Sequence, residues 1–398
     1  MTNFCSRCSS LVAQKSEPFN VLELYSGIGG MRYALQECGL QSLGLKVQFE
    51  AYDINTNANC VYEHNFGKSD LNQRNIVSLS AEEFDSVSID LMTMSPPCQP
   101  FTRQGLKLDI EDCRSDSFVH VIEEVIPNMK LKPKHIFIEN VKGFEESKAR
   151  NMTIELLKRI GYDIKEFLLS PIDVGIPNSR LRYYMLAKLD SKICISDTET
   201  IHTSVPHLDL KQCCENCVNH YFPNIDGAKN EISFEKRTIS DFIDPGLRND
   251  EEKCNEYYLP DKLLNKYGTI LDIVDYASDR SCCFTRGYGA LVQGTGSVLK
   301  TNDRLSVSEV FAKIEKWTES ETIEESERRI QILRTLKLRY FSPQEVSNLM
   351  SFPKSFSFPT NLTNRQKYKL LGNSVNISVI SFLIKLLLLN FKQYCSHE

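Results

Sequence analysis

Residues 20–30 have the sequence NVLELYSGIGG, an apolar run followed at once by a glycine-rich turn. Residues 20–25 have the composition of a buried strand. The residues after the turn repeat apolar side chains at helical spacing, at Met31, Ala34, Leu35 and Cys38. A strand that leads through a glycine turn into a helix is typical of a βαβ unit, so this stretch predicts an α/β fold.

The same alternation continues along the first half of the chain. Further strand-like runs occur at residues 47–52, 89–94, 135–138, 167–169 and 183–189. Strands that alternate with helical segments predict a doubly wound, mostly parallel sheet. The apolar stretch at residues 375–391 is interrupted by Asn376, Lys385 and Asn390, so we expect a buried helix there rather than a membrane span.

The character of the sequence changes after about residue 190. Residues 191–335 are polar and irregular and lack the βαβ rhythm, which returns near Leu338. We therefore expect a catalytic domain formed by residues 18–190 and 337–398. A smaller domain, residues 191–336, would be inserted into it.

Charge and cysteine content limit the possible functions. The 398 residues carry a net charge of −5, which argues against a protein that coats nucleic acid non-specifically but leaves room for a local basic face. One candidate for such a face is Arg365, Lys367 and Lys369. The 14 cysteines are scattered and the first ten residues are polar, so we expect reduced thiols and a location in the cytoplasm or the nucleus.

Two Cys-x-x-Cys pairs raise the alternative of a zinc site. They could supply four ligands together with neighbouring side chains, the candidates being Cys5, Cys8, Cys213, Cys214, Cys217 and His220. The pairs are far apart in sequence, and the chemistry inferred below needs no metal. We expect no metal site.

The glycine turn and the end of the second strand together suggest a nucleoside cofactor. Gly27 and Gly29 let the backbone approach a ligand closely, but Arg32 breaks the G-x-G-x-x-G spacing of dinucleotide sites. Asp53 follows the second strand, where a carboxylate can accept hydrogen bonds from ribose hydroxyls, and Ile54 could cover an adenine. A helix N-cap is the alternative role for Asp53. A nucleoside without pyrophosphate fits S-adenosylmethionine.

A cysteine and a carboxyl group are predicted at the same edge of the sheet. Pro96 and Pro97 end the strand at residues 89–94 and would hold Cys98 on a stiff loop at its carboxyl end. Glu139 ends another predicted parallel strand. A buried, inert thiol is the alternative for Cys98.

Arg180 and Arg182 alternate at the entry to the last strand, so we expect both on one face. They could bind a base oxygen, a phosphate or Glu139 itself. A plain surface pair is the alternative.

These groups suit methyl transfer to cytosine. If the thiolate of Cys98 adds to C6 while Glu139 protonates or hydrogen-bonds N3, C5 becomes nucleophilic enough to attack a sulfonium methyl group. Positive charge near Cys98 would favour its thiolate, and partial burial would keep Glu139 protonated. The base must leave its stack to reach such a pocket.

Five motifs resemble the cytosine-5 methyltransferases and occur in that family's order, at residues 24–30, 96–99, 139–141, 178–182 and 371–375. The resemblance implies a class I S-adenosylmethionine-dependent methyltransferase fold in which the insert is a target-recognition domain. It also implies a cofactor site lined by Tyr25, Gly27, Ile28, Gly29, Asp53, Ile54, Asn75, Ile76, Pro97 and Asn373. Asn75 stands where many relatives have Asp, so an amide would contact the adenine.

Residues 281–289 and 294–299 resemble the recognition region of the DNA-methyltransferase-like tRNA methyltransferases. That family methylates a cytosine in the anticodon loop of tRNA-Asp, where the base is already partly unstacked. We expect substrate contacts from Gln99, Asn178, Cys283, Phe284 and Thr285, although Phe284 is equally compatible with a core position. A monomeric tRNA methyltransferase with weak activity on DNA is expected. A DNA methyltransferase and a catalytically silent nucleic-acid-binding relative are the alternatives.

Overall fold

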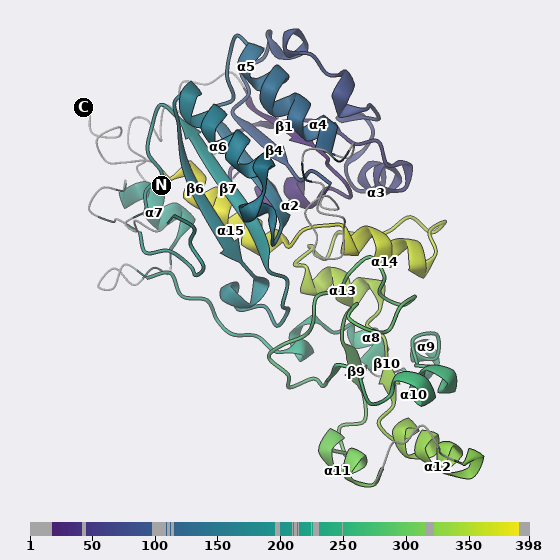
Figure 1. The fold of residues 1–398 in the computed structure, drawn as a ribbon. Coiled ribbons are helices and arrows are strands. Elements are labelled where there is room, and N and C mark those ends of the chain that lie inside the picture. Colours follow the sequence, from purple (N-terminus) through teal and green to yellow (C-terminus); the bar gives the residue numbers. More distant parts are fainter. Residues whose placement is uncertain are drawn as a thin grey trace. The chain divides into compact units, whose positions relative to one another are not determined.

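The computed structural model describes residues 18–41, 45–97, 109, 112, 115–195, 200–208, 210, 213, 215–223, 225, 231–248, 250–314 and 322–389. They form two compact units (Figure 1). The first takes its described residues from Met1–Val174, Leu181–Phe234 and Val375–Glu398. The second consists of Gly175–Arg180 and of the described part of Glu235–Ser374.

The first unit is built on a seven-stranded sheet with the order β3-β2-β1-β4-β5-β7-β6. Its strands are β1 (Phe19–Leu24), β2 (Val47–Tyr52), β3 (Leu71–Asn72), β4 (Leu91–Met94), β5 (His135–Val141), β6 (Tyr162–Leu169) and β7 (Arg182–Leu189). Neighbouring strands are parallel except that β7 runs antiparallel to both β5 and β6. The doubly wound, mostly parallel sheet of the class I methyltransferase fold is confirmed. The two-residue β3 was not predicted, because it is too short to show a periodic pattern.

Helices cover both faces of this sheet (Figure 1). They are α2 (Gly30–Glu37), α3 (Thr56–Phe66), α4 (Asp116–His120), the π-helical turn η7 (Val121–Val125), α5 (Ile126–Asn128), α6 (Lys148–Ile160), α7 (Glu215–Tyr221) and α15 (Ile377–Leu388). Short 3₁₀ turns lie at η2 (Ile76–Ser78), η3 (Ala81–Phe84), η8 (Phe144–Glu146) and η9 (Pro171–Val174). One core layer packs Leu22, Met92 and Ile136 of the sheet against Phe118 and Val121 of the α4–η7 segment.

The last helix of the first unit is a core element, as expected from its sequence. α15 packs against α2 and β7, and ten of its twelve residues are buried. The helical run Asn364–Leu388 is long and apolar enough to cross a membrane, but 72% of its apolar window is buried inside the protein. That burial is typical of a core helix rather than of a lipid-facing one.

The second unit contains a three-stranded sheet with the order β10-β9-β8 and several short helices. Its strands are β8 (Ile273–Val274), β9 (Val298–Lys300) and β10 (Leu338–Arg339). Its helices are η10 (Ile239–Phe242), α8 (Pro245–Arg248), α9 (Glu251–Cys254), α10 (Asp261–Tyr267), α11 (Val307–Ala312), α12 (Ile323–Arg334), α13 (Pro343–Leu349) and α14 (Asn364–Gly372). A separate core gathers Leu264, Val298, Leu333 and Leu338.

The boundary between the units differs from the one expected at residues 191 and 336. The chain after residue 336 stays in the second unit because β10 pairs with β9 and α13 packs on α14. The start of the expected insert belongs to the first unit, where Leu168 N donates to His202 O at 2.8 Å beside β6.

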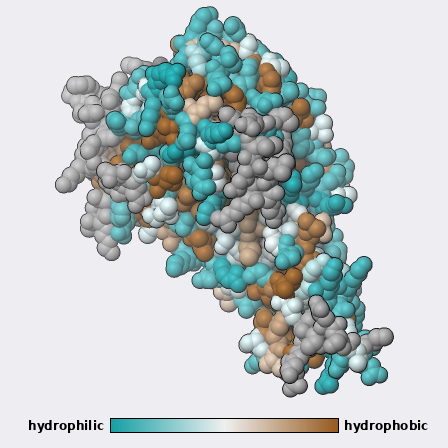
Figure 2. Space-filling model, viewed as in Figure 1, coloured by the Kyte–Doolittle hydropathy of each residue, from teal (hydrophilic) through white to brown (hydrophobic). Residues whose placement is uncertain are grey.

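On the face drawn in Figure 2, apolar residues appear as scattered patches among hydrophilic ones.

Candidate active site

The glycine turn after β1 is shaped for a close approach by a ligand. Gly27 has a φ of 56°, and among the described residues a Cβ added there would meet nothing nearer than Tyr25 O at 4.0 Å, so these residues leave open space beside its backbone. Gly29, with a φ of 85°, has a different reason to be glycine, because a Cβ would lie 2.2 Å from the ring of Phe66. Tyr25 itself has a φ of 60°, which is rare for a residue with a side chain. The turn is therefore open on one side and packed on the other.

Asp53, which follows β2, holds this turn in place. Its Oδ2 accepts a hydrogen bond from Gly27 N at 2.8 Å and its Oδ1 accepts one from Asn55 N at 2.7 Å. The N-cap of α3 is Asn55, whose side chain accepts from Ala58 N, so the capping role considered for Asp53 belongs to its neighbour. Burial raises the pKa of Asp53, and the backbone N–H donors counteract part of that rise.

The side chains expected around an adenine lie near the sheet edge that carries the glycine turn. Ile54 is 66% exposed, although it is a large apolar residue, and Asn75 is also exposed. Asn75 Oδ1 accepts from Val77 N at 3.2 Å, which leaves its amide nitrogen without a partner among the described residues. Ile28 and Ile76 are buried in the core, so only their backbones could face a cofactor.

The chemical end of the site begins where β4 ends. Ser95 Oγ donates to Tyr25 O at 3.1 Å and so ties the end of β4 to the glycine turn. Pro96 is buried and Pro97 is exposed. Cys98 and Gln99 lie outside the described residues, so their predicted roles as nucleophile and substrate contact stay predictions.

Glu139 and Arg182 meet on neighbouring strands at this edge. Arg182 Nε lies 3.5 Å from Glu139 Oε1, and both side chains are largely buried. In the register of β5 and β7, Val141 pairs with Arg182 and Glu139 with Tyr184, so Glu139 and Arg182 lie on the same face. One of the partners considered for the arginine pair, Glu139, is therefore a contact of Arg182.

Arg180 has different partners from Arg182. Its guanidinium group donates to Phe284 O at 3.1 Å and to Gly372 O at 3.0 Å, both in the second unit. The strand alternation that predicted both arginines on one face therefore does not hold. The physical reason is that β7 begins only at Arg182, so the two-residue alternation of a strand does not extend back to Arg180.

The residues expected to bind substrate in the second unit divide into a buried and a half-exposed group. Phe284 is only 2% exposed and packs edge-on against Tyr288 and Phe341, which favours the core position over base stacking. Cys283 and Thr285 are half-exposed. Asn178 is buried, and its amide donates to Ser281 Oγ at 3.1 Å and to Cys282 O at 3.0 Å, so it supports the segment that begins at residue 281.

Several residues at these sites carried no recognisable signal in the sequence. Ser117 Oγ accepts a hydrogen bond from Tyr25 Oη at 2.9 Å, and Ser281 Oγ donates to Pro177 O at 2.6 Å. Ser95, described above, is a third. Single serines that bind groups distant in the sequence can be found only from the fold. Asn373, expected at the cofactor, follows α14 in the second unit.

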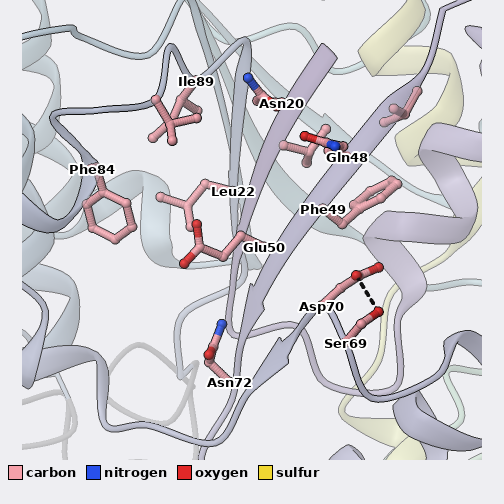
Figure 3. Close-up of a pocket in the computed structure, with 13 residues that line it drawn as sticks. Asn20, Leu22, Gln48, Phe49, Glu50, Ser69, Asp70, Asn72, Phe84 and Ile89 are labelled. Atoms are coloured by element: carbon pink, nitrogen blue, oxygen red, sulfur yellow. Dashed lines mark hydrogen bonds between the residues drawn. The ribbon is translucent and has the colours of Figure 1, made fainter. Parts of the chain in front are cut away.

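A cavity of about 460 Å³ lies elsewhere on the same sheet (Figure 3). Its walls include Asn20 and Leu22 of β1, Gln48 and Glu50 of β2, and Ile89. It lies toward the amino-terminal halves of these strands, whereas the glycine turn follows their carboxyl ends. This cavity is not part of the candidate active site.

Within the described residues, no group of three or more metal-ligating side chains comes together. Cys213 is buried, and its thiol donates to Cys194 O at 3.9 Å. The side chains of Cys5, Cys8, Cys214 and Cys217 are not among those described, so the zinc alternative is untested.

Comparison with known proteins agrees with this arrangement. A family model described as C-5 cytosine-specific DNA methylase matches residues 19–388. The human tRNA (cytosine(38)-C(5))-methyltransferase is 39% identical, over 93% of this chain and 99% of its own length. A Dictyostelium discoideum DNA (cytosine-5)-methyltransferase is 36% identical, over 93% and 94% of the two chains. The crystal structure of a Spodoptera frugiperda DNMT2 mutant superposes with a TM-score of 0.74 at 38% identity, over 92% and 99%.

Proposed function

Because this chain belongs to the C-5 cytosine-specific DNA methylase family, we propose that it methylates C5 of a cytosine in the anticodon loop of a tRNA. The observation that supports the chemistry is the contact between Glu139 and Arg182 at the sheet edge where β4, the strand that precedes Cys98 in the sequence, also ends. The tRNA substrate is supported by the names of its relatives. We take the target to be cytosine 38 of tRNA-Asp.

The residues at the glycine turn fit S-adenosylmethionine, the cofactor of this family. The space beside Gly27 would be filled by a Cβ, and Ser26 Oγ is buried without a hydrogen-bond partner among the described residues. Asp53 would accept hydrogen bonds from the ribose hydroxyls, and Ile54 and Asn75 would contact the adenine. The cofactor supplies an electrophilic methyl group.

The protein's own residues make C5 of cytosine reactive. The thiolate of Cys98 forms a bond to C6 while Glu139 gives its proton to N3, which places electron density on C5. Arg182, in contact with Glu139, orients that carboxyl group. After methylation, solvent water takes the C5 proton as the C6–S bond breaks and releases the thiolate, and N3 returns its proton to Glu139.

A basic surface in the second unit supports an RNA substrate. Arg365 and Lys369 are exposed and one turn apart on α14, and Arg286 is exposed in the segment that packs against the end of this helix. Arg365 and Lys369 belong to the basic cluster noted in the sequence, and Arg286 adds a third positive charge in the same unit. Such a local patch offsets the acidic net charge where RNA phosphates would bind.

The direct test uses methyl-labelled S-adenosylmethionine with total tRNA, a tRNA-Asp transcript and duplex DNA side by side. Label in tRNA-Asp alone supports the proposal, whereas label only in DNA rejects the tRNA substrate and favours the second candidate, which the name of the Dictyostelium relative raises. Cys98→Ala should abolish transfer but keep cofactor affinity. RNA containing 5-fluorocytosine should form a denaturant-resistant adduct with the wild-type protein only, because fluorine blocks elimination. A catalytically silent relative would form none.

We further propose that the protein acts as a monomer in the cytoplasm or the nucleus. The support is its scattered free cysteines and the absence of a need for a second chain in the chemistry above. Sedimentation at micromolar concentration and cell fractionation test the two statements. A stable dimer or a secreted product would contradict them.

A further inference from the structure

Two short segments of the second unit, residues 177–180 and 281–284, lie side by side. Ser179 N donates to Ser281 O at 2.8 Å, and Ser281 Oγ donates back to Pro177 O at 2.6 Å. Side-chain and backbone bonds therefore alternate along this junction. It joins parts of the chain that are more than one hundred residues apart.

Arg180 extends the junction to a third segment. Its side chain is only 4% exposed, and its guanidinium group donates to Phe284 O at 3.1 Å, to Gly372 O at 3.0 Å and to Ser374 O. A further contact joins it to Cys283 Sγ at 3.5 Å. The planar fork of arginine offers donors in several fixed directions, so one side chain can bind three carbonyl groups.

The third segment also touches the first two directly. A Cβ added to Gly372 would lie 2.1 Å from Arg286 N and 2.3 Å from the carbonyl carbon of Thr285. The end of α14 thus packs backbone to backbone against residues 285–286. Asn373 lies in the sequence between Gly372 and Ser374, and Arg180 binds the carbonyl groups of both of these neighbours.

We propose that Arg180 is a positioning residue that holds the segment 281–286 and Asn373 in one fixed arrangement. This inference rests on the proposed function and on the expectation from the sequence that this segment contacts the substrate and Asn373 the cofactor. One guanidinium group then sets both binding surfaces of the second unit. Arg182 differs because it contacts Glu139 at the reacting base.

Substitution by lysine distinguishes the role of Arg180 from that of Arg182. Arg180→Lys keeps the charge but cannot span three carbonyls, so we expect the KM for tRNA and the Kd for S-adenosylmethionine to rise together by about tenfold, as for one lost hydrogen bond to a charged group. The rate at saturation of both should change by less than about threefold, and calorimetry gives the Kd without turnover. The matched control, Arg182→Lys, should lower kcat and leave both binding constants near wild type.

A second variant guards against loss of folding. If circular dichroism shows that Arg180→Lys is unfolded, Ser281→Ala removes two bonds of the same junction and should raise both binding constants in the same direction, by less. A fall in kcat with unchanged KM and Kd would overturn the inference, because Arg180 would then act on the reacting base. If the wild-type protein fails to methylate tRNA, the proposed function fails, but the calorimetric shift still decides the role of Arg180.

Discussion

The two units build their candidate sites in opposite ways. In the first unit, Asp53 follows β2 and Glu139 lies near the end of β5, so the hydrogen-bonded ladder of a seven-stranded sheet places both. In the second unit, β8 has two residues and β9 has three, and the segment at 281–286 is held by individual side chains on backbone groups. The candidate catalytic residues of the first unit rest on regular backbone, whereas the candidate recognition segment of the second unit rests on particular side-chain contacts.

This difference has a consequence for mutations. A conservative change at the sheet edge should alter a chemical step without moving its neighbours, because the backbone there is supported elsewhere. A change in the second unit should spread through packing and affect binding and stability together. Four substitutions test that contrast.

The largest effect is expected at Glu139. Glu139→Gln keeps the size and the contact with Arg182 but removes the acidic proton, so we expect kcat to fall by about 10²- to 10⁴-fold. The Kd for S-adenosylmethionine and the melting temperature should stay near wild type. Glu155→Gln, which alters an exposed carboxyl group paired with Arg159 on α6, is the control and should leave all three unchanged. A broad loss of stability in Glu139→Gln would break the contrast between the units.

The next effect is expected at Gly372 in the second unit. A Cβ there would lie 2.1 Å from Arg286 N, which is backbone and cannot turn aside, so Gly372→Ala should cost about 3 kcal/mol in the free energy of unfolding. The KM for tRNA should rise as well. Denaturant titration and steady-state kinetics measure the two effects.

Gly246→Ala is the matched control for this substitution. Gly246 lies in a helix of the same unit, and its added Cβ would meet only the side chain of Asp244 at 3.2 Å, which can move. We expect a change within about 1 kcal/mol. Equal losses at the two glycines would show that the close approach at Gly372 is not what holds the segment.

The same contrast explains which features could be predicted from the sequence. Strand periodicity, the glycine turn and the prolines after β4 are local patterns, so the sheet and the placement of Asp53 and Glu139 at its edge followed from them. β3 was too short to detect. The alternation that paired Arg180 with Arg182 failed because β7 starts at Arg182.

The second unit was hard to predict for a physical reason. Arg180 binds backbone groups more than one hundred residues away, and neither periodicity nor spacing records such contacts. The burial of Phe284 depends in the same way on Tyr288 and Phe341. The compact units divide at other residues than the expected domains, and the pairing of β10 with β9 that contributes to this division could not be seen in two residues.

A smaller effect is expected at Asp53, where the first unit would hold the cofactor. Asp53→Asn keeps the size but removes the charge and one acceptor, so we expect the Kd for S-adenosylmethionine to rise by about 10- to 100-fold, the equivalent of one charge-assisted hydrogen bond. At saturating cofactor, kcat should recover. Calorimetry measures the Kd, and Asp85→Asn, which alters a half-buried partner of the exposed Lys130, is the control.

The pKa of Asp53 adds a pH dependence to that prediction. Burial raises this pKa, and the ribose hydroxyls donate to the ionised carboxylate. Affinity for the cofactor should therefore be complete above the raised pKa and should fall as the pH drops through it, starting at a higher pH than for an ordinary aspartate. The Asn variant should lack this dependence, and a parallel profile for both proteins would contradict the assignment.

The last prediction concerns a buried carboxyl group in the first unit. Glu23 lies on β1, two residues before Tyr25, and is 1% exposed; Tyr62 Oη donates to its Oε2 at 3.1 Å. Burial raises its pKa from 4.5 to about 8, although Tyr62 and Arg32 act in the opposite direction. Between these two values the folded protein binds a proton that the unfolded chain has lost. Stability must then decrease as the pH rises through that window, by at most about 1.4 kcal/mol per pH unit.

Glu23→Gln should abolish this slope, because glutamine stays neutral and can still accept the hydrogen bond from Tyr62. The free energy of unfolding, measured with urea between pH 6 and pH 9, should show wild type losing stability relative to the variant across that range. The two proteins should be nearly equal only below the ordinary pKa of 4.5, where Glu23 is protonated in both the folded protein and the unfolded chain, and at pH 6 wild type should already be the less stable of the two. Equal slopes for both proteins would mean that Glu23 is ionised in the folded state, and the glycine turn would then lie above a buried charge rather than a neutral acid.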